Sequence, residues 1–158
     1  MTPRMTDYLQ RAEAGFGPLM ALEAAIKGGP LEPRLLHLVK LRASQINGCA
    51  YCIHMHTVEA LRDGDAPLRL HMLTAWRESS LYSERERAAL SWTEALTELA
   101  QTGAPDADWA LVEAAFSPDE RAWLSLAIGA INVWNRVQVG FRAAHPTTFP
   151  ALAQADAA

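Results

Sequence analysis

Apolar residues recur along most of the chain at the three- and four-residue spacing of amphipathic helices. One such stripe follows Pro33, which suits the first turn of a helix. Its apolar positions are Leu35, Leu38, Val39 and Ile46. Glycines, prolines and polar turn residues punctuate the pattern, and together they predict helices over residues 6–27 (interrupted at 15–18), 33–47, 49–62, 68–78, 83–99, 107–116 and 118–143. No segment alternates polar and apolar residues for long enough to predict a strand.

Two of these helices have their start marked by a capping box. Ser83 precedes Glu86 by three residues, and Ser117 precedes Glu120 by the same spacing. In this motif the serine hydroxyl accepts a hydrogen bond from the backbone N–H three residues on, and the glutamate carboxylate accepts one from the serine N–H. Pro118 at the first helical position supports the second start. We therefore expect helices to begin just after Ser83 and Ser117.

The composition supports the same fold class. Alanine, the strongest helix former, occurs 29 times, while β-branched residues are comparatively few. The length of 158 residues is that of one ordinary domain, and half of the residues are apolar, enough to bury a core. We expect a single all-α domain over residues 1–158 with about six to eight helices and with frayed ends at 1–5 and 151–158.

Charge and hydropathy exclude several classes of protein. The formal net charge is −4 and the isoelectric point is about 5.7, which excludes a generic basic nucleic-acid binder. The most apolar run, residues 122–139, is interrupted by serine, asparagine, arginine and glutamine and is too polar to span a bilayer. Residues 1–17 lack the apolar segment of a secretory signal. We therefore expect a cytoplasmic protein that binds neither nucleic acid nor membranes.

The two cysteines of the chain lie in one short motif, NGCAYCIHMH at residues 47–56. On a helix that begins just after Gly48, three side chains share a face about 60° wide, namely Cys49, Cys52 and His56. His54 points to the other side. In a reducing compartment, such a cysteine pair is redox-active or binds metal more often than it forms a structural disulfide.

This arrangement favours a reactive dithiol. Cysteines three residues apart on one helix face can close into a disulfide, and Cys52 lies one helical turn from His56, within reach of a thiol–imidazole hydrogen bond. The N–H groups and the partial positive charge of a helix N-terminus also stabilise a thiolate. That effect is larger for Cys49, which is nearer the N-terminus, so the residues alone leave open which cysteine attacks a substrate.

Metal binding is the main alternative chemistry for this motif. Its candidate ligands suit tetrahedral zinc and are Cys49, Cys52, His54 and His56. On one helix, however, His54 points away and leaves three ligands on one face. A four-ligand site would need an irregular segment or a donor from elsewhere in the chain. We therefore expect no bound metal, and dithiol chemistry requires no organic cofactor.

Residues 35–63, which contain this motif, resemble the core of the AhpD-like alkylhydroperoxidases within the carboxymuconolactone decarboxylase superfamily. Residues 76–97 and 130–142 resemble further segments of that family. The resemblance implies an all-α fold, a homo-oligomer and thiol-dependent reduction of alkyl hydroperoxides, which is a peroxiredoxin-like antioxidant activity. It also implies that an external dithiol, such as a lipoyl-bearing protein, reduces the enzyme after each cycle.

The resemblance also implies roles for the residues of the motif. Cys52 would attack the peroxide, Cys49 would resolve the sulfenic acid into a disulfide, and His56 would belong to a proton relay. The family usually carries a relay glutamate twelve positions before the first cysteine, where this chain has His37. A histidine can move protons near neutral pH, but it cannot supply a negative charge beside His56. We therefore expect His37 to act in the site, with altered pH dependence or weaker peroxidase activity.

Other functions are compatible with the same cysteine pair. A general disulfide oxidoreductase or a non-catalytic redox sensor could use it, whereas the lactone decarboxylases of the superfamily do not use a dithiol. Six further residues are expected to pack in the interior, with contact to the motif, to substrate or to another subunit as the alternative. They are Tyr51, Met55, Asn132, Trp134, Asn135 and Arg136.

Overall fold

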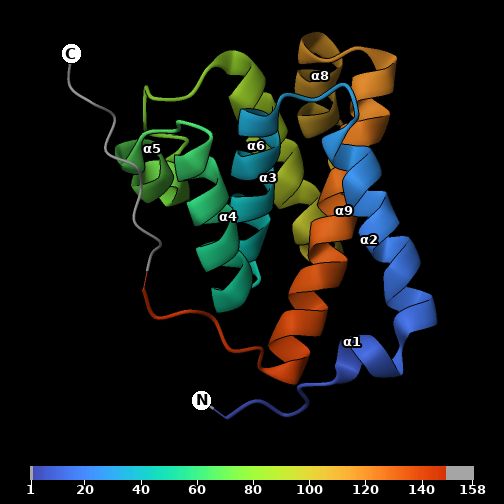
Figure 1. Cartoon of the computed structure of the whole chain (residues 1–158). Coiled ribbons are helices and arrows are strands. Elements are labelled where there is room, and N and C mark those ends of the chain that lie inside the picture. Colours follow the sequence, from blue (N-terminus) through green and yellow to red (C-terminus); the bar gives the residue numbers. More distant parts are fainter. Residues whose placement is uncertain (1, 149–158) are drawn as a thin grey trace.

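The computed structural model describes residues 2–148, which form helices and connecting segments without a strand (Figure 1). The elements follow in the order α1 (Tyr8–Arg11), α2 (Glu13–Lys27), α3 (Pro33–Ile46), α4 (Ala50–Arg62), α5 (Pro67–Met72), the 3₁₀ turn η1 (Leu73–Ala75), α6 (Glu84–Thr97), α7 (Leu99–Thr102), α8 (Asp106–Ala115) and α9 (Pro118–Phe141). The prediction of an all-α fold is confirmed. The described residues contain nine α-helices, one more than the upper expectation, because α1 and α7 are separate short helices.

Both predicted capping boxes are present. Ser83 Oγ accepts a hydrogen bond from the N–H of Glu86, whose carboxylate accepts one from the N–H of Ser83. Ser117 and Glu120 make the same pair of bonds at the start of α9. Helices α6 and α9 therefore begin where the spacing predicts, since these bonds satisfy backbone N–H groups that have no partner within the helix.

The predicted interruption of the first helical region is wrong in position. The chain breaks at Ala12, between α1 and α2, and α2 continues through residues 15–18. Phe16 in this stretch packs its ring against Trp134 of α9 and against Tyr8 of α1, with centroids 5.8 Å apart in each case. These tertiary contacts favour a continuous helix and outweigh the low helix propensity of the nearby glycines and proline.

Helix α3 is central and packs against α4, α6 and α9 (Figure 1). Its buried side chains belong to two hydrophobic clusters. One cluster joins α3 to α6, α8 and α9 and includes Val39, Leu124 and Ile128. The other joins α3 to α4, α6 and the segment 67–82, and it includes Leu38 and Leu73. Because α3 is buried on both sides, its C-terminal end, which leads into the cysteine motif, is held in a fixed position.

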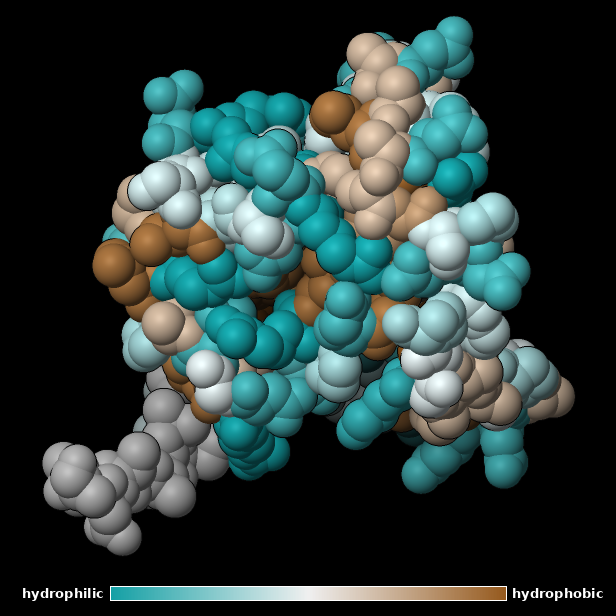
Figure 2. Space-filling view, turned by 90° about the horizontal axis from the view of Figure 1, so that it is seen from above, coloured by the Kyte–Doolittle hydropathy of each residue, from teal (hydrophilic) through white to brown (hydrophobic). Residues whose placement is uncertain are grey.

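The outside of the molecule is mostly hydrophilic on the face seen from above in Figure 1, with hydrophobic surface visible around a central hollow (Figure 2). No helix in residues 2–148 is both long and apolar enough to cross a membrane. Near the N-terminus, the backbone N–H of Arg4 donates to Phe141 O at 2.9 Å. Fraying at residues 1–5 stays a prediction, and residues 151–158 lie outside the described part of the chain.

Candidate active site

A tight turn joins α3 to α4 and positions the cysteine motif. Gly48 has φ +65°, in the left-handed region that glycine adopts without strain. The N–H of Gly48 bonds to Gln45 O at 3.2 Å. The N–H of Cys49 bonds to Ser44 O at 3.0 Å. These two bonds form a Schellman motif, which closes α3 and directs the chain into α4.

Buried amide side chains hold this turn against α9. The Asn47 side chain donates to Asn132 Oδ1 and to Asn135 Oδ1, each at 2.9 Å. Asn135 in turn donates to Ser44 Oγ at 3.0 Å. Asn132 and Asn135 are buried, so the interior role expected of them is combined with contact to the motif. The network pairs polar groups that burial would otherwise leave without hydrogen bonds.

Cys49 is the N-cap of α4, and Cys52 lies in the first turn of that helix. They are joined as a disulfide with Cα atoms 5.4 Å apart, and each residue is 1% exposed. Cys49 Sγ also accepts a hydrogen bond from the N–H of Cys52 at 3.3 Å. With φ −84° and ψ 93°, Cys49 has an extended backbone and precedes the first helical residue. The helical spacing used in the prediction therefore applies to Cys52 and His56, which lie within α4, and not to Cys49.

His56 lies one turn after Cys52 and is 4% exposed. Its Nδ1 lies 2.8 Å from Glu59 Oε2, and its buried Nε2 has no hydrogen-bond partner among the described residues. Burial lowers the pKa of His56, and the Glu59 carboxylate opposes that effect. The hydrogen bond from His56 lowers the pKa of Glu59. A neutral His56 therefore donates its Nδ1–H to an ionised Glu59 and carries its lone pair on Nε2.

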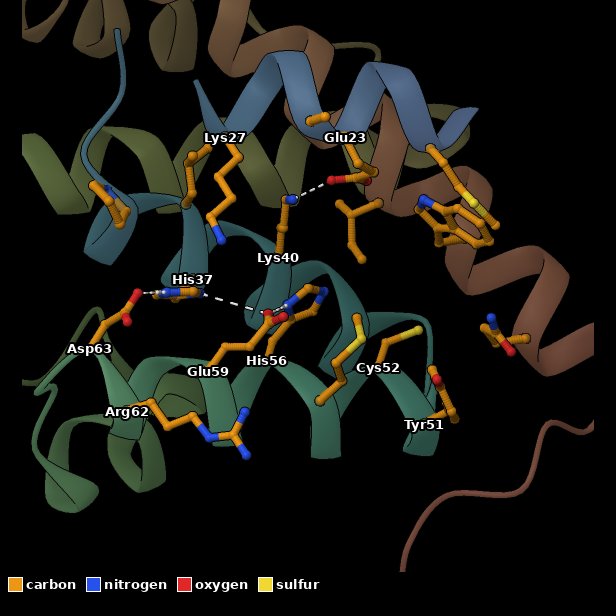
Figure 3. A pocket seen from close by; sticks show the side chains of 18 of the residues that line it. Glu23, Lys27, His37, Lys40, Tyr51, Cys52, His56, Glu59, Arg62 and Asp63 are labelled. Atoms are coloured by element: carbon orange, nitrogen blue, oxygen red, sulfur yellow. Dashed lines mark hydrogen bonds and ion pairs between the residues drawn. The ribbon is translucent and has the colours of Figure 1, made fainter. Parts of the chain in front are cut away.

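His37, on α3, approaches the same carboxylate from the other side. Its Nε2 lies 2.7 Å from Asp63 Oδ2, and its Nδ1 lies 4.0 Å from Glu59 Oε2. Figure 3 shows the Glu59 carboxylate between the two imidazoles. Glu59 was not predicted as a site residue from the sequence, although its position three residues after His56 places both side chains on one helix face. Glu59 supplies the negative charge that a histidine at position 37 cannot supply.

These groups line a cavity of about 670 Å³ (Figure 3). Cys52, His37, His56 and Glu59 all contribute to its wall, whereas Cys49 does not. Apolar and aromatic side chains form another part of the wall: Leu9, Met20, Leu36, Tyr51, Met55, Ile131 and Trp134. Three of the residues expected to pack in the interior, Tyr51, Met55 and Trp134, thus face this cavity. A cavity with an apolar wall and a few converging polar groups is typical of a small-molecule site.

His54 lies outside this group of side chains. It does not line the main cavity, and its Nε2 lies 3.4 Å from Thr148 O. Its ring centroid is 6.0 Å from that of His145. The cysteines are bonded to each other, so the four ligands considered for zinc in the sequence do not converge on one point. The geometry favours dithiol chemistry for Cys49 and Cys52.

Sequence comparison relates the chain to a known family. The family model of the carboxymuconolactone decarboxylase family matches residues 16–95, which include the cysteine motif and Glu59. YdfG, an uncharacterized protein of Bacillus subtilis (strain 168), is 36% identical over 140 residues, which are 87% of this chain and 95% of YdfG.

Solved structures show the same arrangement of helices. A protein of unknown function from Agrobacterium tumefaciens, proposed to be the antioxidant defence protein AhpD, has a TM-score of 0.89 and 45% identity, over 93% of this chain and 100% of that one. An uncharacterized peroxidase-related protein from Ralstonia eutropha JMP134, with an alkylhydroperoxidase AhpD core, has a TM-score of 0.78 over 94% of this chain and 80% of that one. At 17% identity, this second likeness concerns the fold alone. The chain belongs to the carboxymuconolactone decarboxylase family and has the AhpD-like fold of that superfamily.

Proposed function

We propose that this protein is an oxidoreductase that reduces organic hydroperoxides with its two cysteines. The observation that carries the proposal is the position of Cys52, which lines a cavity beside a buried histidine held by a carboxylate. Membership of a family that includes enzymes, and the antioxidant role proposed for the 45% identical relative, support the same reading.

The proposed cycle has three steps. The Cys52 thiolate attacks the terminal peroxide oxygen, the O–O bond breaks, and Cys52 becomes a sulfenic acid, while the departing alkoxide takes up a proton and leaves as an alcohol. The Cys49 thiol then attacks the Cys52 sulfur, which forms the disulfide and releases water. An external dithiol finally reduces the disulfide by exchange and leaves in its own disulfide form. The Cys49–Cys52 disulfide of this structure corresponds to the state after the second step.

Access to the cavity favours Cys52 as the attacking residue. Cys52 lines the cavity and Cys49 does not, so a hydroperoxide bound there reaches the Cys52 sulfur first. The partial charge of the helix N-terminus favours a thiolate at Cys49. A buried thiolate with no access to the substrate does not react with it, however, and Cys49 is therefore assigned the resolving role.

His56 is the proposed base for Cys52, and Glu59 is its positioning residue. With Nδ1–H donated to Glu59 at 2.8 Å, the lone pair on Nε2 is available to accept the thiol proton of Cys52. The carboxylate then stabilises the imidazolium that forms, and the imidazolium returns the proton to the leaving alkoxide. A disulfide has no thiol proton to offer, which agrees with a buried Nε2 that has no hydrogen-bond partner within residues 2–148.

His37 is proposed to influence this proton transfer through Glu59, which it approaches at 4.0 Å. Its substitution by glutamate, the residue that the resemblance places at this position, tests that role. We expect His37→Glu to change the rate of peroxide reduction, and an unchanged rate would count against the participation of His37.

The experiment that tests the proposed function counts free thiols in reduced, metal-free protein before and after one equivalent of cumene hydroperoxide. Wild type should lose both thiols, Cys49→Ser should accumulate a sulfenic acid, and Cys52→Ser should not react. A sulfenic acid in Cys52→Ser alone would reverse the roles of the cysteines. Thiols that persist in wild type would contradict the peroxidase function, and disulfide exchange or redox sensing would become the better description. Turnover with dihydrolipoamide distinguishes an enzyme from a sensor.

A further inference from the structure

Three side chains in the cavity wall form a group that the peroxidase cycle uses only in part. His37 on α3 and His56 and Glu59 on α4 each offer one ligand atom, and these atoms all lie within 4.8 Å of one another. Two imidazoles and one carboxylate are a common ligand set for zinc in sites that keep a coordination position open. The cycle needs His56 and Glu59, but it does not require His37 to present a particular ring nitrogen.

Asp63 fixes the orientation of His37. Its Oδ2 lies 2.7 Å from His37 Nε2, so a neutral imidazole donates Nε2–H to this carboxylate and carries its lone pair on Nδ1. A carboxylate on the outer nitrogen is the usual second partner of a metal-binding histidine. The Nδ1 lone pair lies 4.0 Å from Glu59 Oε2, which is also an acceptor. A cation between these two acceptors, either a proton on the imidazole or a metal ion, makes their approach favourable.

The distances between the ligand atoms lie on either side of those found around a metal ion. Zinc bonds of about 2.0–2.2 Å in a tetrahedron place neighbouring ligand atoms roughly 3.3–3.6 Å apart. Glu59 Oε2 lies 2.8 Å from His56 Nδ1 and 4.0 Å from His37 Nδ1, one distance below that range and one above it. Binding an ion therefore requires the Glu59 carboxylate to move away from His56 Nδ1 and closer to His37 Nδ1. Such a shift is within the freedom of a side chain that is 43% exposed.

We propose that His37 Nδ1, His56 Nδ1 and the Glu59 carboxylate bind a divalent transition-metal ion of the zinc type in the disulfide form of the protein. Three protein ligands leave a coordination position open toward the cavity.

Metal binding and thiol chemistry compete for His56. A metal ion on Nδ1 forces the single proton of the neutral imidazole onto Nε2, because each neutral imidazole carries one N–H. When such an ion stays bound after the disulfide is reduced, Nε2 no longer accepts the thiol proton of Cys52, and peroxide reduction is inhibited. This consequence rests on the proposed function, whereas the binding of the ion does not.

The binding test uses full-length oxidised wild-type protein, in which the disulfide removes both cysteines as ligands. Titration calorimetry with Zn²⁺ near neutral pH is expected to show a single ion per chain. Asp63→Asn, at an exposed position, should weaken binding about tenfold, and His37→Ala should weaken it at least as much. The matched control is His71→Ala, which removes an exposed imidazole outside the cavity and should leave the affinity unchanged.

Absence of Zn²⁺ binding to the oxidised protein would overturn the proposal. Unchanged binding in both His37→Ala and Asp63→Asn would overturn it too, as would an equal loss in His71→Ala. Circular dichroism establishes that each variant is folded, and the visible absorption of bound Co²⁺ should develop in wild type and be lost in His37→Ala. Zn²⁺ binding to the oxidised protein, together with no peroxide turnover by the reduced, metal-free protein, supports the metal site and contradicts the peroxidase function. Turnover by the metal-free protein without Zn²⁺ binding does the reverse.

Discussion

Glu59 contacts the Nδ1 atom of His56 at 2.8 Å from one helical turn further along α4. The AhpD-like resemblance implies a glutamate at position 37, where this chain has a histidine. Glu59 lies on the same helix as His56, so His56 has a carboxylate partner without a glutamate at position 37, and the packing of α3 on α4 brings His37 to within 4.0 Å of that carboxylate. His56 therefore keeps a negatively charged partner although position 37 is a histidine.

Glu59→Gln is expected to lower the rate of sulfenic acid formation at Cys52 by about tenfold or more. The amide keeps the size of the side chain but has no negative charge to stabilise the imidazolium of His56. Glu59→Asp keeps the charge at a shorter reach and should recover part of the rate. Stopped-flow measurement with cumene hydroperoxide provides the rates in the Cys49→Ser background.

The matched control for this prediction is Glu78→Gln, an exposed position outside the cavity, which should react like the parent protein. Equal rates for Glu59→Gln and its parent would show that Glu59 does not assist proton transfer. Equal losses in Glu59→Asp and Glu59→Gln would assign the effect to the shape of the side chain rather than to its charge.

The turn between α3 and α4 depends on the backbone conformation of Gly48. A Cβ atom at this position meets no atom within 4 Å, so space does not limit substitution. The φ of +65° is nevertheless unfavourable for a residue with a Cβ, by about 1–2 kcal/mol. Gly48→Ala is therefore expected to lower the free energy of unfolding by about 1 kcal/mol, measured by urea denaturation.

Gly129, in the middle of α9, is the control for this substitution. A Cβ atom there also meets nothing within 4 Å, but its backbone is helical. Gly129→Ala should therefore raise the free energy of unfolding by about 0.5–1 kcal/mol. Opposite signs at the two positions would assign the loss to backbone conformation. A Gly48→Ala variant as stable as wild type would contradict this account of the turn.

The start of α9 is expected to lose stability in acid. Glu120 accepts hydrogen bonds from Arg85 Nη2 at 2.6 Å and from the N–H of Ser117 at 2.8 Å. The bond from Arg85 and then the bond from Ser117 lower the pKa of Glu120 from 4.5 to about 2. Because the pKa is lower in the folded state, this stabilisation is present above about pH 4.5 and is lost as the pH falls toward 2.

The free energy of unfolding of Glu120→Gln should be lower than that of wild type at pH 7 by about 1 kcal/mol. The effect is modest because solvent screens the ion pair between Arg85 and Glu120, whose side chains are 29% and 21% exposed. The difference should shrink between pH 4.5 and pH 2. Urea denaturation at several pH values measures it, with Glu78→Gln as the exposed control. A difference that does not vary with pH would contradict an electrostatic origin.

Several apolar side chains on α9 stay exposed in the single chain. Leu126, Val133 and Val139 are 42%, 46% and 46% exposed. The AhpD-like resemblance implies a homo-oligomer, and contact between copies through α9 would remove these side chains from water. Light scattering at micromolar concentration is expected to give a multiple of 17.3 kDa, and Val133→Glu should shift the mass toward a single chain. A wild-type mass of one chain would contradict the prediction.

Much of the fold could be predicted because its signals are local. The serines at 83 and 117 and the glutamates three residues later make hydrogen bonds within one turn, and such bonds depend only on spacing. The prediction failed at residues 15–18, where the glycines and proline indicated a break. There, Phe16 packs against α9, a contact with a residue more than a hundred positions away that local propensity does not contain.

The spacing of the residues alone settled the helical class, the starts of α6 and α9, and the placement of Cys52 and His56 one turn apart. These features depend on hydrogen bonds and side-chain directions within a single helix. Tertiary structure alone decided that Cys52 and not Cys49 reaches the cavity, that Asn47 is tied to α9, and that His37 and Glu59 meet. Those contacts join different helices, and their geometry is set by how the whole core packs around α3.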